Sequence, residues 1–146
     1  MIVVTGATGN VGRPLVRALS AAGAEVTAVS RRPAGNELPP GVRHHAADLA
    51  EPDGLKVALD GADALFLLLA GELVATGRDA VGLVGAVRAG GVRQVVLLSS
   101  QGTRTRPGAA SLAGLRAAED AVRQSAWTGR SCARAVSTPT RPCGRR

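Results

Sequence analysis

Short apolar, β-branched runs alternate along the chain with longer segments in which apolar positions recur at helical spacing. The first run, residues 2–5, ends at Gly6 and is typical of a buried parallel strand. Residues 11–22 follow a helical period, with Pro14 in the first turn and Gly23 after the last periodic position. The chain therefore opens with a strand, a glycine turn and a helix.

The same alternation continues to residue 124 and predicts the fold class. Further strands are expected at residues 25–30, 42–46, 64–69 and 94–100, and further helices at 52–59, 81–89 and 112–124. Apolar strands separated by helices predict a parallel sheet covered on both faces, and right-handed crossovers make it doubly wound. We expect an α/β, Rossmann-like domain with strand order 3-2-1-4-5 and a ligand crevice at the C-terminal ends of strands one and four.

The glycine turn after the first strand reads GATGNVG, from Gly6 to Gly12. In a dinucleotide-binding turn the first glycine permits the tight turn, the second lets the backbone approach a pyrophosphate, and the third lets helix and strand pack closely. The position between a strand and a helix is the context that this motif requires. The alternative is a glycine-rich turn without a ligand. The candidate cofactor-binding residues here are Gly6, Thr8, Gly9, Asn10, Val11 and Gly12.

The end of the second strand decides which dinucleotide fits. An acidic residue there favours NAD, but the chain has Ser30, Arg31 and Arg32. A guanidinium matches the 2′-phosphate of NADP. Arg31 and Arg32 are therefore candidate cofactor-binding residues, and NADP(H) is preferred over NAD(H). The alternative is an ordinary solvated arginine pair on a loop.

Composition narrows the class of protein further. The chain has 146 residues, 45% of them hydrophobic, which suits one domain of ordinary size with a core. It has no Tyr, one Phe and one Trp, which disfavours a base-stacking module and a specific nucleic-acid partner. The longest apolar stretch, residues 62–70, falls far short of the roughly 20 residues that span a bilayer. The N-terminus lacks the features of a secretory signal, so a cytoplasmic protein without membrane association is expected.

The net charge of +7 comes largely from the C-terminal segment. Five of the 18 basic side chains and none of the 11 acidic ones follow residue 124, which leaves +2 for the rest. Both cysteines, Cys132 and Cys143, also lie there, so no disulfide framework or metal-binding cysteine pair is expected. His44 and His45 are adjacent on a strand and point to opposite faces, so they cannot hold one metal ion. Asp60 and Asp63 flank Gly61 and suit a turn better than a catalytic pair.

The glycine motif, SRRP after the second strand, AADL at Asp48 and LLSS before a helix together resemble the atypical short-chain dehydrogenase/reductases, specifically the NmrA-like NAD(P)H-binding group. The resemblance covers residues 1 to about 124, the expected NAD(P)-binding domain. It implies that Asp48 and Leu49 lie near the adenine and that residues after the fourth strand wall the cofactor. Those residues are Leu68, Leu69 and Ala70. The resemblance also places Ser99 or Ser100 near the nicotinamide, as weak catalytic candidates.

The chain departs from this family in its acid–base groups. Short-chain reductases use a Tyr-x-x-x-Lys pair, but this sequence has no Tyr, and its only Lys, Lys56, lies in another helix. Relatives often carry Lys or His four residues before the last helix's Glu, where this chain has Leu115 before Glu119. No general acid is identifiable. Hydride transfer to a quinone-like acceptor needs fewer protein groups, because the cofactor carries the chemistry.

From Ser125 the helical periodicity stops and Arg, Pro and Ser dominate, so residues 125–146 are expected to form a disordered basic tail. Relatives have a motif like SGLDWTVLRPGGF at this place. One codon choice for residues 125–141, with one G restored after the codon for Ser125, encodes SGLDWTVLRPGGFDSNA. We interpret the tail as an out-of-frame reading of a longer gene. The alternative is a genuine Pro-rich tail that binds nucleic acid or acidic partners.

Two functions stay open at this stage. The resemblance implies an oxidoreductase that, at full length, reduces a quinone-like or other small acceptor with NADPH. The alternative is a non-catalytic redox-sensing regulator that binds the dinucleotide and acts through a protein partner. The fifth strand is expected to be an open sheet edge, through which the chain could self-associate.

Overall fold

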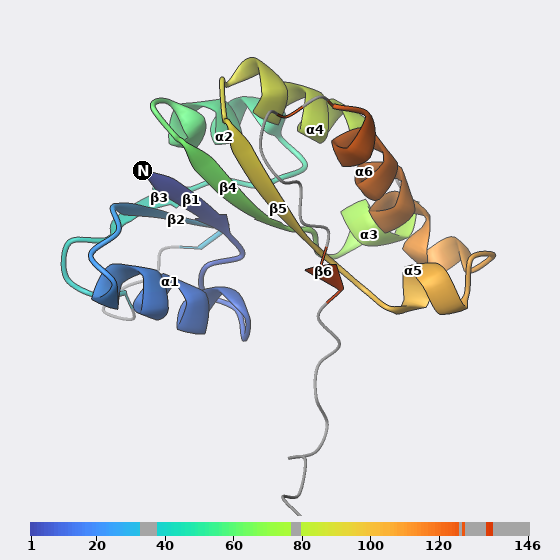
Figure 1. The fold of residues 1–146 in the computed structure, drawn as a ribbon, viewed down its shortest axis with the longest axis horizontal. Coiled ribbons are helices and arrows are strands. Elements are labelled where there is room, and N and C mark those ends of the chain that lie inside the picture. The colour runs from blue at the N-terminus through green and yellow to red at the C-terminus, as the bar shows by residue number, and fades with distance from the viewer. Residues whose placement is uncertain (33–37, 77–79, 126, 128–133, 136–146) are drawn as a thin grey trace, which may run out of the picture.

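A computed structural model of the protein describes residues 1–32, 38–76, 80–125, 127 and 134–135 (Figure 1). Its centre is a parallel sheet with strand order β3-β2-β1-β4-β5-β6. The strands are β1 (Ile2–Thr5), β2 (Val26–Ser30), β3 (Arg43–Ala46), β4 (Ala64–Leu68), β5 (Gln94–Ser99) and β6 (Arg134–Ala135). The expected order of the first five strands, and the Rossmann-like class with it, is confirmed.

Helices connect the strands. They are α1 (Gly12–Ala21), α2 (Pro52–Leu59), α3 (Glu72–Thr76), α4 (Ala80–Ala89), α5 (Gly102–Thr105) and α6 (Ala113–Gln124), with a 3₁₀ turn, η2 (Ala110–Leu112), before the last. The periodicity predicted α1, α2, α4 and α6. It missed α3, α5 and η2, because segments of three to five residues are too short to show a helical period.

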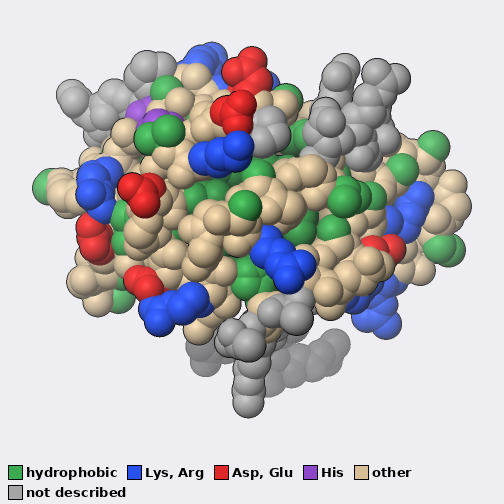
Figure 2. Space-filling model, turned by 90° about the horizontal axis from the view of Figure 1, so that it is seen from above, with side chains coloured by type: hydrophobic (Ala, Val, Ile, Leu, Met, Phe, Trp, Pro, Cys, Tyr) green, Lys and Arg blue, Asp and Glu red, His purple; other side chains and the backbone are tan. Residues whose placement is uncertain are grey.

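The sheet separates two cores of unequal size. Helix α1 lies against one face, and α2, α4 and α6 lie against the other (Figure 1). Alternation along β1 sends Val3 into the larger core under α2, α4 and α6 and Val4 into the smaller core under α1. Basic and acidic side chains are interspersed on the face that carries α2, α4 and α6 (Figure 2).

Helices cover both faces of the sheet, but the cover of β4 and β5 is more complete on one face than on the other. On the side of α2, α4 and α6, Leu65 and Leu67 are buried. On the side of α1, Phe66 is only half-buried and Val96 is 40% exposed. The reason is geometric, because α1 packs mainly against β1 and β2.

Two parts of the C-terminal segment also differ from expectation. Leu98 and Ser99 of β5 pair with Arg134 and Ala135, so β5 is not an open edge at its C-terminal end. Strand pairing uses backbone groups, which a polar segment supplies as well as an apolar one. Trp127, which composition assigns to the tail, packs against the larger core and donates a hydrogen bond from its indole nitrogen to the Val92 carbonyl at 2.7 Å. Packing on the larger core therefore continues past residue 124, and the rest of the expected tail after Trp127, apart from residues 134–135, lies outside the described residues.

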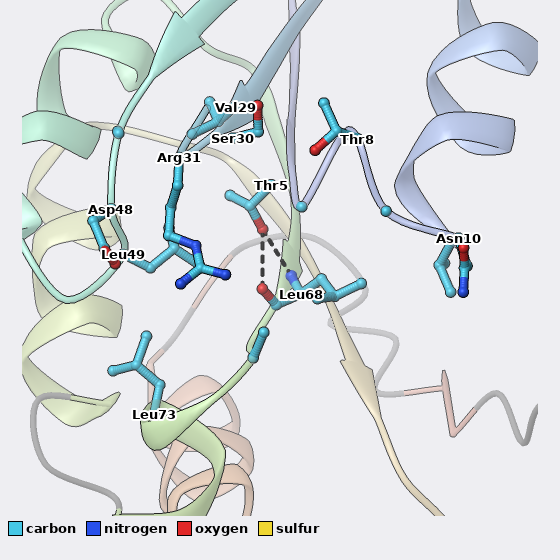
Figure 3. Close-up of a pocket in the computed structure, with 15 residues that line it drawn as sticks. Thr5, Thr8, Asn10, Val29, Ser30, Arg31, Asp48, Leu49, Leu68 and Leu73 are labelled. Atoms are coloured by element: carbon cyan, nitrogen blue, oxygen red, sulfur yellow. Dashed lines mark hydrogen bonds between the residues drawn. The ribbon is translucent and has the colours of Figure 1, made fainter. Parts of the chain in front are cut away.

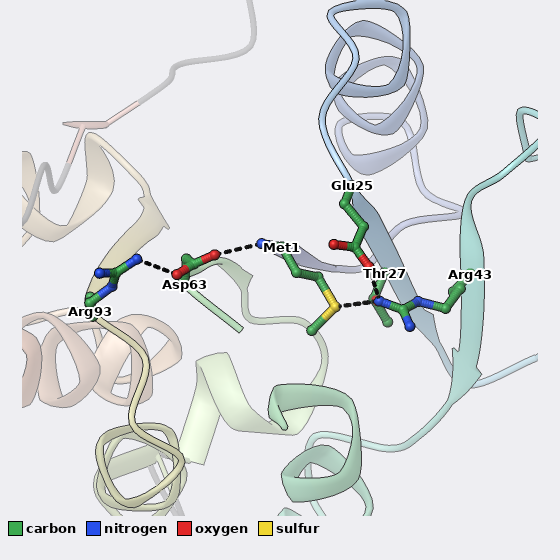
Figure 4. A network of polar contacts seen from close by, with 6 residues as sticks. All are labelled: Met1, Glu25, Thr27, Arg43, Asp63 and Arg93. Atoms are coloured by element: carbon green, nitrogen blue, oxygen red, sulfur yellow. Dashed lines mark hydrogen bonds and ion pairs between the residues drawn. The ribbon is translucent and has the colours of Figure 1, made fainter. Parts of the chain in front are cut away.

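The N-terminal ends of the strands are joined by polar contacts (Figure 4). The Met1 ammonium donates to Asp63 at 2.6 Å, and Arg93 pairs with the other oxygen of that carboxylate. Arg43 pairs with Glu25 and donates to the Met1 sulfur at 2.8 Å. These contacts lie at the edge of the sheet opposite the glycine turn. Asp63 thus has a structural role, as its position at a turn predicted. No helix in the described ranges is long and apolar enough to cross a membrane.

Candidate functional site

The glycine turn brings β1 back toward the start of α1. Gly6 has a φ of 64°, a left-handed conformation that side chains other than glycine rarely adopt. The turn is closed by a hydrogen bond from the Gly9 amide to the Gly6 carbonyl at 3.0 Å, and the Ala7 amide donates to Val29 of β2 at 3.1 Å. The first glycine therefore has the role that the motif assigns to it.

Gly12 and Gly9 lack side chains for different reasons. A Cβ atom at Gly12 would lie 2.2 Å from the Gly6 oxygen and 2.8 Å from the Ala7 Cα, so only glycine lets α1 approach the turn. A Cβ atom at Gly9 would meet only the Gly6 oxygen, at 3.2 Å, and otherwise open space. Gly12 is thus required for packing behind the turn, whereas Gly9 keeps the space in front of it clear.

The start of α1 presents backbone donors at this turn. The N-cap residue, Val11, makes no side-chain capping hydrogen bond. Within the described ranges, no backbone carbonyl accepts a hydrogen bond from the amides of Asn10, Val11 or Gly12. Unpaired N–H groups and the positive end of the helix dipole form a site for an anionic group.

A cavity of about 320 Å³ opens in front of this turn, at the C-terminal ends of β1, β2 and β4 (Figure 3). Ten residues expected from the sequence line it: Gly6, Thr8, Gly9, Asn10, Val11, Arg31, Asp48, Leu49, Leu68 and Ala70. Five lining residues were not expected: Thr5, Val29, Ser30, Ala47 and Leu73. Thr5 and Ser30 end strands, Val29 directly precedes the end of β2, and Ala47 directly follows β3, so a place at the C-terminal end of a strand was the available signal. Leu73 lies on α3, which gave no signal.

Thr5 fixes the floor of the cavity between two strands. Its hydroxyl oxygen accepts a hydrogen bond from the Leu68 amide at 2.8 Å, and the hydroxyl lies 3.2 Å from the Phe66 carbonyl, to which it donates. The side chain itself is fully buried. The junction of β1 and β4, where the winding of the sheet reverses, is therefore held by a side chain as well as by the ladder.

Arg31 extends from the end of β2 across the cavity, with its guanidinium between Leu49 and Leu68 in Figure 3. The side chain is exposed, and no carboxylate in the described part of the chain forms an ion pair with it. The Asp48 carboxylate accepts a hydrogen bond from the Ala50 amide at 3.0 Å, which holds the turn after β3. The cavity thus has a cation at one end and the helix amides at the other.

Four residues expected at the cofactor do not line this cavity. Gly12 lies behind the turn, Arg32 is exposed beyond the end of β2, and Leu69 is buried in the larger core. Ser99 is buried and donates to the Glu119 carboxylate of α6. Leu69 and Ser99 point away because successive side chains of an extended segment alternate between faces.

The two histidines of β3 contact different partners. His44 lies 2.9 Å from the Ser30 hydroxyl, whereas the His45 Nε2 donates to the Gly54 carbonyl of α2 at 2.9 Å. Their partners lie on different elements, as alternation along β3 predicted. Among the residues that the structure describes, no group of three or more potential metal ligands comes together.

A parallel doubly wound sheet with a glycine turn, free helix amides and a cavity at the switch point defines a nucleotide-binding α/β protein. A family model described as NAD(P)H-binding matches residues 6–128. The chain belongs to this NAD(P)H-binding family. A search of the curated proteins finds no match.

Solved structures share the fold. Citrobacter sp. triphenylmethane reductase is 24% identical with a TM-score of 0.73, over 86% of this chain and 46% of its own. An NADPH-dependent quinone oxidoreductase from Escherichia coli is 22% identical with a TM-score of 0.66, over 86% and 44%. A short-chain dehydrogenase/reductase superfamily protein from Agrobacterium tumefaciens with bound NAD is 27% identical with a TM-score of 0.66, over 84% and 44%. The chain spans less than half the length of each.

Proposed function

We propose that this chain is the NADP(H)-binding domain of an NmrA-like oxidoreductase that, as part of a longer protein, reduces a quinone-like or other small acceptor with NADPH. The single observation that carries the proposal is the position of Arg31, which extends over a cavity that begins at the glycine turn. A guanidinium at the end of β2 suits the 2′-phosphate that distinguishes NADP from NAD.

The residues present fit a dinucleotide. The amides of Asn10, Val11 and Gly12 would bind the pyrophosphate, and Gly9 leaves the room for its approach. Asp48 and Leu49 would border the adenine, and Leu68 and Ala70 would wall the cofactor. When bound, the nicotinamide supplies hydride chemistry. The protein's part is to bind and orient it.

The acceptor is proposed from what the chain lacks as well as from its fold. The sequence has no Tyr to protonate a carbonyl substrate in the manner of short-chain reductases. A quinone accepts a hydride into a conjugated ring and needs less help from a protein acid. Two proteins of the same fold, the quinone oxidoreductase and the triphenylmethane reductase, support this class of acceptor.

A second function, that of a non-catalytic redox-sensing regulator, is favoured by the contacts of Ser99. Ser99, one of the two serines that the resemblance places near the nicotinamide, donates a hydrogen bond to Glu119, and Leu115 stands four residues before that Glu. A redox-sensing regulator that binds the dinucleotide without turnover and signals through a protein partner would need neither a catalytic serine nor a lysine.

Titration with NADPH and NADH, followed by steady-state NADPH oxidation with a panel of quinones, tests the proposal. Binding with turnover supports the oxidoreductase, and tight binding without turnover supports the regulator. Gly9→Val is the control for specific binding. Absence of binding of either dinucleotide would overturn both functions.

We propose further that the residues after Ser125 are read out of frame, and that the version continuing with SGLDWTVLRPGGF is the active one. Resequencing the gene around the codon for Ser125 tests this directly. An unchanged reading frame, together with quinone reduction by the chain as written, would overturn it.

A further inference from the structure

Two side chains hold the turn of residues 30–32, which carries Arg31. They are Ser30 of β2 and His44 of the neighbouring strand, β3. Ser30 is the last residue of β2, is 8% exposed and lines the cavity. Its hydroxyl donates to the carbonyl of Arg32 at 2.7 Å and lies 2.9 Å from the Nε2 of His44 on β3. The Ser30 hydroxyl oxygen thus links the carbonyl of Arg32 to the side chain of His44 on β3, and Arg31 lies between Ser30 and Arg32 in the chain.

Proton counting fixes the direction of both hydrogen bonds. A carbonyl oxygen can only accept, so the single hydroxyl proton of Ser30 goes to Arg32. The Ser30 oxygen must then accept from His44, which requires the proton of the imidazole to be on Nε2. The result is a directed relay from His44 through Ser30 to the Arg32 carbonyl.

We propose that His44 is a positioning residue that sets the preference for NADP(H) by holding the turn of residues 30–32 so that Arg31 faces the cavity. The inference rests on the cofactor preference proposed above. Arg31 is exposed and has a long, flexible side chain, so ordering it on a phosphate costs free energy. A backbone that is already held in the binding conformation reduces this cost and so increases the affinity for the phosphate. His44 does not line this cavity and acts through Ser30.

The adjacent histidine provides a matched control. His45 also donates from Nε2 to one acceptor at 2.9 Å, but that acceptor is the Gly54 carbonyl on the other side of the sheet. His45→Leu removes the same residue type and one hydrogen bond of the same length, without touching the turn of residues 30–32. Any general effect of losing a histidine from β3 appears in both variants.

The experiment compares the dissociation constants of NADPH, NADH and 2′,5′-ADP for the full chain and its variants, with circular dichroism to verify folding. His44→Leu is expected to weaken NADPH and 2′,5′-ADP about fivefold to tenfold, the equivalent of one hydrogen bond, and to leave NADH nearly unchanged. His44→Gln, whose amide can still donate to Ser30, should retain most of the preference. His45→Leu should leave the ratio of NADPH to NADH affinities unchanged.

A double-mutant cycle separates the relay from a direct contact of His44 with the ligand. In a Ser30→Ala background the relay is already absent, so His44→Leu should have no further effect on the affinity ratio. Because Ser30→Ala deletes one oxygen atom, it also gives a result if His44→Leu fails to fold.

Two negative results have different meanings. Equal affinities of the unmutated chain for NADPH and NADH would overturn the cofactor preference itself. A clear preference in the unmutated chain that His44→Leu and Ser30→Ala both retain, or a loss of NADPH and NADH affinity by the same factor, would overturn only the role of His44.

Discussion

Ser99 at the end of β5 donates a hydrogen bond to the carboxylate of Glu119 on α6. Thr103 on α5 donates to the same oxygen at 3.1 Å, and Arg123 pairs with the other oxygen at 3.2 Å. Glu119 is 7% exposed, so these partners compensate for the cost of burying its charge. The carboxylate joins β5, α5 and α6, and it binds the hydroxyl of one of the two serines, Ser99 and Ser100, for which the family resemblance implies a place near the nicotinamide.

We predict that Ser99→Ala affects stability rather than cofactor binding. Loss of a hydrogen bond to a buried carboxylate should lower the free energy of unfolding by about 1.5–3 kcal/mol. The dissociation constant of NADPH should change less than about twofold, because the side chain does not face the cavity. Urea denaturation and NADPH titration measure the two quantities. A large loss of NADPH affinity with an unchanged free energy of unfolding would show that Ser99 contacts the cofactor after all.

Gly9 in the middle of the turn and Gly12 at its end give opposite predictions. Gly9→Val should abolish dinucleotide binding at a cost of about 1 kcal/mol in stability, because its side chain projects into the space before the turn. Gly12→Ala should destabilise the fold more strongly, because its Cβ would lie 2.2 Å from the Gly6 oxygen. Thermal melting and NADPH titration of both variants distinguish these effects. A folded Gly9→Val variant that binds normally would show that the cofactor lies elsewhere.

The contacts of Asp63 predict a pH dependence of stability. Its hydrogen bond from the Met1 ammonium, and then that from Arg93, lower the pKa of Asp63 below its usual value of 3.8. A lowered pKa in the folded state means that the charged form stabilises the fold above the unfolded pKa, and that this contribution is lost as pH falls through the folded pKa. Asp63→Asn should therefore melt at a lower temperature than the unmutated chain near pH 7, with the difference closing below about pH 3.8. Added salt should shrink the difference at pH 7. A difference that stays constant down to pH 2 would contradict this role.

Trp127 should contribute far more to the free energy of unfolding than residues 128–146 do. Trp127→Ala should lower the free energy of unfolding by about 2 kcal/mol, because it removes packing on the larger core and the hydrogen bond to Val92. Removal of residues 128–146 should barely change the melting temperature. It should increase self-association, because Leu98 and Ser99 then lose their strand partner. Differential scanning fluorimetry and analytical ultracentrifugation measure these outcomes. A large fall in melting temperature on truncation would show that the segment is an essential part of the domain.

The strand order and six of the fifteen cavity-lining residues could be predicted because they depend on local patterns, and the family resemblance implied four more, which are Asp48, Leu49, Leu68 and Ala70. Apolar runs, glycines and the ends of strands are visible in the sequence, and parallel strands bring their C-terminal ends to one edge. Gly12 illustrates how well a motif can specify geometry, since a Cβ atom at this position would lie only 2.2 Å from the Gly6 oxygen.

The features that the sequence did not predict depend on tertiary contacts that no local pattern records. The orientation of Ser99 depends on Glu119, twenty residues further along the chain. The packing of Trp127 depends on Val92, and the half-exposed face at Val96 depends on how far one helix can reach across the sheet. The roles of Ser30 and His44 also became visible only when β2 and β3 were adjacent.

The central claim is that Arg31 makes this cavity an NADP(H) site, and the affinity ratio of NADPH to NADH for Arg31→Ala tests it most directly. Arg32→Ala is the matched control, since its side chain is exposed outside the cavity. A charge-assisted phosphate contact is worth about 1.5–3 kcal/mol, so the unmutated chain and Arg32→Ala should prefer NADPH by about one to two decades, and Arg31→Ala should bind both dinucleotides with similar affinity. Equal affinities in the unmutated chain, or a preference that Arg31→Ala retains and Arg32→Ala loses, would contradict the claim.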